Sequence, residues 1–179
     1  MFPNFSRVVA ILPKNVGDSL FAVPALRYIA AAQKAAFGRI EIHVTVSPAM
    51  RDLFAAQEFV TSAFADDERT DPRAFFQTRE RIASVRPKCA AIFSGAFRAA
   101  FLAFAARVPA RVGFPTDKRS HLLTHSVPRV PGPYTDGWPD PPGRGRSTDR
   151  LVLDAGIRHL VHSLLRVARA VAPSPFDES

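Results

Sequence analysis

Short apolar runs alternate with longer amphipathic stretches over residues 7–128. Residues 7–12 are apolar and β-branched after the first position, a pattern typical of a strand buried on both faces of a parallel sheet. The next long segment, 19–36, carries Ala, Leu and Phe at helical spacing. Pro24 within it predicts either that the helix starts near Val23, with proline in its first turn, or that the helix is kinked.

The same alternation predicts the rest of the domain. Further strands are expected at 40–46, 60–64, 89–93 and 111–114, extended structure at 122–127, and helices at 48–57, 73–85 and 96–107. Strands and helices that alternate with short connections form a parallel sheet with right-handed crossovers. The predicted fold class is therefore α/β, a Rossmann-like parallel sheet with helices on both faces.

The pattern changes at residue 128. Ten of the eighteen residues 128–145 are proline or glycine. We therefore expect one domain over 1–128, a Pro/Gly-rich linker or disordered segment over 129–150, and a weak C-terminal helix with a tail over 151–179. The last segment is too short to be a complete second domain.

The net charge of +8 is unevenly distributed along the 179 residues. Residues 1–64 carry +2, 65–128 carry +5 and 129–179 carry +1. This favours an anionic partner, which charge alone leaves open as a phosphorylated small molecule, an anionic membrane surface or nucleic acid. The basic residues form no run, and neither a recognition helix nor a zinc-ligand cluster accompanies them, so no nucleic-acid partner is expected.

Cysteine and hydropathy indicate the cellular compartment. The single cysteine, Cys89, lies in an apolar stretch, which favours a buried structural thiol and excludes a disulfide framework. No signal-peptide core and no apolar run of membrane-spanning length occur in the sequence. A cytoplasmic location is therefore expected.

The loop after the first strand is the first candidate site, because ligands of parallel sheets bind beyond the carboxyl ends of the strands. It contains Lys14, Asn15, Gly17 and Asp18, and its single glycine fits neither the dinucleotide fingerprint nor the phosphate loop. Position alone leaves two roles for Asp18, a helix cap or a general base, and Ser19 could supply the cap instead. Lys14 could be a surface lysine and Asn15 a turn residue.

Two blocks of sequence resemble glycosyltransferase family nine, the ADP-heptose:lipopolysaccharide heptosyltransferases. In residues 9–26 a strand is followed by Gly-Asp, a short hydrophobic stretch and Pro-Ala-Leu. Residues 92–100, followed by 108–114 and 118–123, are similar to the family's mid-domain pattern. The resemblance covers about 7–128.

The resemblance implies a GT-B architecture of two Rossmann-like domains, of which this chain would carry the N-terminal, acceptor-side one and be truncated. It implies that Asp18 is the catalytic base of an inverting, metal-independent transfer of heptose from ADP-heptose. The donor pocket would lie mostly in the C-terminal domain, so it is assigned to no residue here. No cofactor is implied.

The implied acceptor is an anionic lipopolysaccharide inner core carrying Kdo and phosphate, which suits the positive middle of the chain. Peripheral contact with the inner membrane is expected on the same grounds. The candidate substrate-binding residues are Lys14, Asn15, Gly17, Ser94, Gly95, Arg98, Lys118 and Arg119. A solvated surface role is the alternative for the basic ones among them.

Three hypotheses about the function remain open. The chain could be a heptosyltransferase that is truncated or completed by another chain, a non-catalytic acceptor-binding or scaffold half-domain, or an unrelated Rossmann-like nucleotide-binding module. His43 is expected to be a packed or edge histidine. His121 and His125 lie four positions apart without other ligand types nearby, so no metal site is expected.

Overall fold

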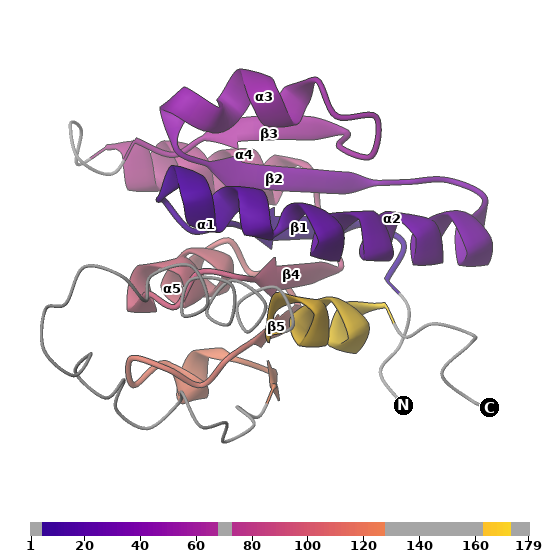
Figure 1. Cartoon of the computed structure of the whole chain (residues 1–179). Helices are drawn as coiled ribbons and strands as arrows, with labels where there is room; N and C mark the ends of the chain where they lie inside the picture. Colours follow the sequence, from indigo (N-terminus) through magenta and orange to yellow (C-terminus); the bar gives the residue numbers. More distant parts are fainter. Residues whose placement is uncertain (1–4, 68–72, 128–162, 173–179) are drawn as a thin grey trace, which may run out of the picture.

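The computed structural model describes residues 5–67, 73–127 and 163–172. A six-stranded sheet forms the centre of the described chain, with strand order β3-β2-β1-β4-β5-β6 (Figure 1). The strands are β1 (Val8–Ile11), β2 (Ile42–Val46), β3 (Ser62–Ala65), β4 (Cys89–Ile92), β5 (Ala110–Gly113) and β6 (His125–Ser126). Every neighbouring pair is parallel. The predicted α/β fold with a parallel sheet is confirmed.

Helices cover both faces of this sheet. They are α1 (Val16–Phe21), α2 (Val23–Phe37), α3 (Arg51–Ala55), α4 (Ala74–Ser84) and α5 (Phe97–Ala105), with 3-10 turns η1 (Pro48–Met50) and η2 (Ser120–Leu122). A further helix spans 163–171. Figure 1 shows α2 and this last helix in front of the sheet and α4 and α5 behind it.

Each face of the sheet has its own hydrophobic core. Val8 and Ala10 of β1 point into the core formed with α2, α3 and the 163–171 helix. Val9 and Ile11 of the same strand point into the core formed with α4 and α5. All four side chains are buried, which explains why β1 is apolar at every position.

The segment predicted as one helix, 19–36, is two helices that meet at Ala22. The backbone N–H of Ala22 donates to the carbonyl of Ser19 at 3.1 Å, which closes α1 with a tight turn. Pro24 has no N–H to continue that helix and lies in the first turn of α2. The interpretation of Pro24 as a helix start near Val23 is confirmed.

The third strand begins later than predicted, at Ser62 rather than at residue 60. β3 is the edge strand of the sheet, and its residues are only partly buried. Its start depends on pairing with β2, where Thr61 N–H donates to the Ile42 carbonyl at 2.7 Å. The start of a strand that depends on such pairing cannot be predicted from the hydrophobic pattern of the sequence.

The predicted linker at 129–150 lies outside the described residues, as does most of the predicted helix over 151–171, of which only 163–171 is described. The proposed domain boundaries therefore stay predictions. Within the described ranges, no helix is long and apolar enough to cross a membrane.

Candidate functional site

The strand order changes direction between β1 and β4, and this is where a parallel sheet forms its ligand crevice. The two strands are in register, with Ile11 opposite Ile92. The segments that follow β1 and β4 separate beyond the sheet, because α2 packs on one face of the sheet and α5 on the other. The diverging segments contain Asp18, in the first turn of α1, and Ser94, in the loop after β4, so the sequence-predicted residues of both blocks lie at one edge.

Asp18 is the third residue of α1 and is partly exposed at this edge. The N-cap of α1 is Asn15, which makes no side-chain capping bond. The Asn15 Nδ2 donates instead to Asp18 Oδ2, at 3.4 Å. The Ser19 hydroxyl donates to the Pro13 carbonyl at 2.6 Å. The expectation that Asp18 or Ser19 caps this helix is therefore wrong, and the Asp18 carboxylate is not used as a helix cap.

A buried carboxylate, Asp66, connects the loops at this edge. Asp66 follows β3 and is 2% exposed. Lys14 Nζ donates to Asp66 Oδ2 at 2.5 Å and to the Asp66 carbonyl at 2.8 Å. Arg98 donates to both carboxylate oxygens, at 2.6 and 3.0 Å. The Thr78 hydroxyl adds a bond of 3.1 Å from α4. One carboxylate thus joins the β1 loop, α4 and α5.

The protonation of Asp66 follows from these partners. Burial alone raises the pKa of this carboxyl group, but the hydrogen bonds and charges of Arg98 and Lys14 outweigh burial and lower it. Asp66 is therefore ionised under ordinary conditions. Lys14 and Arg98 thus share this carboxylate at the carboxyl edge of the sheet.

A second set of contacts joins the β4 loop to the loop after β5. Arg119 is fully buried and donates to the carbonyls of Ser94 at 2.6 Å, Ala96 at 2.9 Å and Phe114 at 3.0 Å. The Thr116 hydroxyl donates to the Gly95 carbonyl at 3.0 Å. These bonds fix the backbone on which Ser94 and Gly95 lie.

The first residue of α5 is held by the same β5 loop. The backbone N–H of Phe97 donates to Asp117 Oδ2 at 2.7 Å. A carboxylate therefore sits at the N-terminus of α5, where the helix dipole stabilises it. Asp117 and Lys118 both have a positive φ of 53°, a conformation that costs energy in a non-glycine residue and fixes the shape of this turn.

The predicted binding residues differ in how far they are exposed to solvent. Lys14 and Arg98 are engaged with Asp66, with side chains 32% and 24% exposed. Arg119 is buried, so it positions the loop and does not present its guanidinium to solvent as a direct acceptor contact requires. Lys118 and Gly95 are exposed and Ser94 is partly exposed.

Gly17 does not have the role that a loop glycine usually has. It lies within α1, and a Cβ atom built on it would meet nothing within 4 Å. Neither a positive φ nor close packing requires glycine there. The space beside Gly17 is open, next to Asp18 in the sequence.

Sequence reasoning missed Asp66, Thr78, Thr116 and Asp117. The pair Asp66-Asp67 at the end of a predicted strand was visible as an acidic loop, and its position at a carboxyl end of the sheet was the available signal. Thr116 and Asp117 carry no such signal, since their roles depend on the packing of one loop on another.

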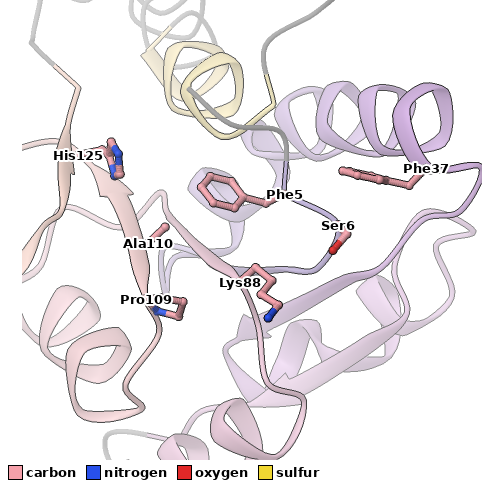
Figure 2. Close-up of a pocket in the computed structure, with 7 residues that line it drawn as sticks. All are labelled: Phe5, Ser6, Phe37, Lys88, Pro109, Ala110 and His125. Atoms are coloured by element: carbon pink, nitrogen blue, oxygen red, sulfur yellow. The ribbon is translucent and has the colours of Figure 1, made fainter. Parts of the chain in front are cut away.

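The described pocket is at the opposite edge of the sheet, near the amino ends of the strands. It has a volume of about 430 Å³, and Figure 2 shows the side chain of Phe5 between Ala110 on one side and Phe37 on the other. Lys88, which precedes β4, also lines it. No residue of the candidate site contributes to this pocket.

His43 is buried in β2, with Nδ1 2.7 Å from the Ser62 hydroxyl and its ring stacked on Phe64. The expected packed histidine is confirmed. Burial lowers the pKa of His43; Arg7 adds to this effect and Glu41 opposes it. Among the described residues, no cluster of three or more His, Cys, Asp or Glu could hold a metal ion.

The strand order and the helices on both faces define this chain as a Rossmann-like α/β protein, with its candidate site at the carboxyl edge of the sheet. Comparison with solved structures shows which kind of Rossmann-like fold this is. The chain has the heptosyltransferase-like fold of glycosyltransferase family 9, as expected from the sequence. No family model matches the chain, and no curated protein matches it.

Three solved structures share this fold. A family 9 glycosyl transferase from Veillonella parvula has a TM-score of 0.67 at 13% identity, over 98% of this chain and 43% of its own. E. coli heptosyltransferase WaaC, with ADP-2-deoxy-2-fluoro heptose, has a TM-score of 0.64 at 14% identity, over 97% of this chain and 50% of its own. E. coli ADP-heptose lps heptosyltransferase II has a TM-score of 0.51 at 23% identity, over 65% and 33%. This chain spans half or less of each.

Proposed function

We propose that this chain is the acceptor-side domain of a heptosyltransferase-like glycosyltransferase acting in lipopolysaccharide inner-core synthesis. The observation that carries the proposal is the position of Asp18, a partly exposed carboxylate at the switch-point crevice that caps no helix. The shared fold supports it, and so does the solved WaaC structure with ADP-2-deoxy-2-fluoro heptose.

In the proposed reaction, Asp18 accepts the proton of an acceptor hydroxyl while that oxygen attacks the anomeric carbon of ADP-heptose. The bond from that carbon to the ADP oxygen breaks, ADP leaves, and the configuration at carbon is inverted. Asn15 donates to Asp18 Oδ2 and so orients the carboxylate, which leaves Oδ1 to face the acceptor. A base within hydrogen-bond reach of the reacting hydroxyl contributes about 10²–10⁴ to the rate.

The acceptor that fits this edge is an anionic core sugar-lipid carrying Kdo and phosphate. Lys118 is an exposed cation of the loop after β5, and Lys14 and Arg98 lie at the same edge, where they bind Asp66. Ser94 and Gly95 present a hydroxyl and backbone to the same space. Arg119 acts indirectly, by holding the carbonyls of that loop.

The binding test uses the full chain and Kdo-lipid A in detergent micelles. Lys118→Ala should weaken binding about tenfold, since a charge-assisted contact to phosphate contributes about 1.5 kcal/mol or more. Lys88→Ala removes an equal charge at the opposite edge of the sheet and should leave binding unchanged. Equal effects of the two substitutions would mean that only net charge matters, and the site assignment would be wrong.

The transfer test uses a protein in which a donor-binding second domain completes this chain, and it follows the release of ADP from ADP-heptose with the same acceptor. Asp18→Asn should abolish transfer and leave acceptor affinity nearly intact, whereas Glu58→Gln, an exposed carboxylate before β3, should change neither. Transfer retained by Asp18→Asn would refute the catalytic role.

An acceptor-binding module without transfer is the second candidate, since this chain spans half or less of each solved relative. It predicts acceptor binding with no measurable binding of ADP-heptose. Binding of a nucleotide with no response to acceptor would favour a Rossmann-like nucleotide module instead.

A further inference from the structure

Helix α5 is apolar on both its buried and its exposed sides. Its inner face, including Ala100 and Leu102, is buried in the second core. Its outer face carries Phe97, Phe101 and Phe104, at positions i, i+4 and i+7, and these are 40%, 40% and 49% exposed. A surface helix ordinarily has polar residues on its outer side. A contiguous apolar row in that place marks a surface that meets something other than water.

The phenylalanines form one continuous aromatic surface. The Phe97 and Phe101 ring centroids are 6.1 Å apart, and those of Phe101 and Phe104 are 6.5 Å apart. Phe75 of α4 stacks on Phe101 at 5.5 Å and contacts Phe76, which is 60% exposed. We call these five residues the α4/α5 aromatic surface.

Basic residues surround this surface. Arg98 lies over the Phe75 ring at 5.4 Å, and Arg111 lies over the Phe104 ring at 5.5 Å. Lys118 is exposed in the loop that packs on the start of α5, and Arg107 is exposed at its end. The sequence of α5 itself contains no acidic residue.

Three acidic groups near the aromatic surface have partners among the described residues. Asp66 is buried with Lys14 and Arg98, and Asp117 accepts the Phe97 N–H. Glu80 of α4 lies 3.9 Å from Arg79. The exposed cations Arg107 and Lys118 beside the aromatic surface favour an anionic layer with an apolar interior as its partner.

We propose that the α4/α5 aromatic surface docks this chain on an anionic lipid bilayer. Phenylalanine rings enter the boundary between headgroups and acyl chains, while the exposed Arg107 and Lys118 side chains reach the lipid phosphates. A second copy of this chain fits less well, because a symmetric contact would bring the same cations against each other. The fold places α4 and α5 together on one side of the sheet, so a single flat surface can contact them both (Figure 1).

The docked orientation connects the bilayer to the candidate site. Phe97 is the first residue of α5, two positions after Gly95, so one end of the aromatic row lies at the carboxyl edge of the sheet. A bilayer along α5 brings lipid headgroups beside that edge. Docking is measured without donor or acceptor, so its failure and the failure of the proposed transfer reaction are distinguishable.

The experiment is sedimentation of the full chain with phosphatidylcholine vesicles that contain phosphatidylglycerol, and with vesicles of phosphatidylcholine alone. The wild type should bind the anionic vesicles, and raised salt should weaken the binding. The variant Phe97→Ser/Phe101→Ser/Phe104→Ser should bind about tenfold more weakly or worse. The control Phe37→Ser/Leu53→Ser removes similarly exposed apolar groups, 40% and 47%, from α2 and α3 on the other side of the sheet. It should bind like the wild type.

A thermal unfolding curve for each variant checks that it folds, and the single substitution Lys118→Glu serves as a second probe that leaves the apolar packing intact. It should also weaken binding to the anionic vesicles. Absence of binding, equal binding to neutral vesicles, or equal loss in the control variant would overturn the proposal. So would a dimer in sedimentation velocity that the triple variant abolishes, because the surface would then belong to a second copy.

Discussion

Lys14 and Asp66 are 52 positions apart in the sequence, yet one ammonium group donates both to the carbonyl and to the carboxylate of Asp66. Arg98, from a third element, donates to both oxygens of the same carboxylate in a bidentate geometry. The loop that precedes Asp18 is thus tied to the helix that follows Ser94. The relative position of the two flanks of the crevice depends on one buried side chain.

Asp66→Asn should destabilise the fold by about 3 kcal/mol, because it leaves two partly buried cations without their shared anion. Urea unfolding followed by circular dichroism measures this directly. The control is Asp52→Asn, which breaks an exposed pair with Arg51 whose side chains are 56% and 85% exposed, and should cost less than about 0.5 kcal/mol. Equal losses for the two variants would mean that Asp66 has no special structural role.

Much of the fold could be predicted from the sequence because its strongest signals are local. The β1 run is apolar at every position, since both faces of the strand are buried. Pro24 marks a helix start because a proline N cannot donate a hydrogen bond. β3, an edge strand with partly exposed residues, was displaced by two positions because its start is set by pairing with β2.

The candidate site was less predictable. The Gly17-Asp18 pair follows a buried strand and could be placed at the carboxyl edge by topology alone. Lys14 and Arg98 were predicted as substrate contacts on the basis of their charge, and nothing in their local sequence indicates that both bind Asp66. Arg119 was also chosen for its charge, but its burial beneath the Ser94 carbonyl depends on the path of the β5 loop.

The buried His43 should make stability fall in mildly acidic solution. Its pKa in the folded chain is below the ordinary value of 6.5, so the unfolded chain binds more protons between the two values. The stability that the neutral, buried His43 contributes is therefore fully present above pH 6.5, and it is lost as the pH falls toward the lowered pKa. Asp66 titrates below 3.8, outside this window.

The experiment measures the free energy of unfolding as the pH falls from neutral. For His43→Gln this free energy should decline less than for the wild type. For the control His121→Gln, exposed in η2, it should decline as in the wild type. Parallel curves for the wild type and His43→Gln would contradict this assignment.

Cys89 should report on global opening of the sheet. It is 0% exposed in β4, and burial raises the pKa of its thiol, so neither access nor ionisation favours reaction in the folded chain. Alkylation should be at least about a thousandfold slower than in denaturant, in line with the small unfolded population of an ordinary domain. Ser84→Cys, exposed at the end of α4, supplies a second thiol that should react at once. Rapid labelling of Cys89 in the folded chain would show that β4 opens locally.

Two glycines at this edge should respond in opposite ways to alanine. A Cβ on Gly113 would lie 3.1 Å from both the Cβ and the carbonyl oxygen of Ile92, the strand residue paired with it. Since backbone cannot yield easily, Gly113→Ala should cost about 1–2 kcal/mol. A Cβ on Gly17 would meet nothing within 4 Å, so Gly17→Ala should stabilise α1 by about 0.5–1 kcal/mol.

The space beside Gly17 can then be tested for function without loss of the fold. Gly17→Leu fills this open space and should unfold at the same denaturant concentration as Gly17→Ala or slightly lower, since leucine is also a good helix former. If this space receives the acceptor, Gly17→Leu should weaken binding of Kdo-lipid A micelles about tenfold or more, while Gly17→Ala should retain most of it. Calorimetric titration of both variants beside their unfolding curves separates crowding from instability. Equal acceptor affinity in the two variants would place the acceptor elsewhere on the carboxyl edge, with Lys118 and Ser94 as the remaining candidates.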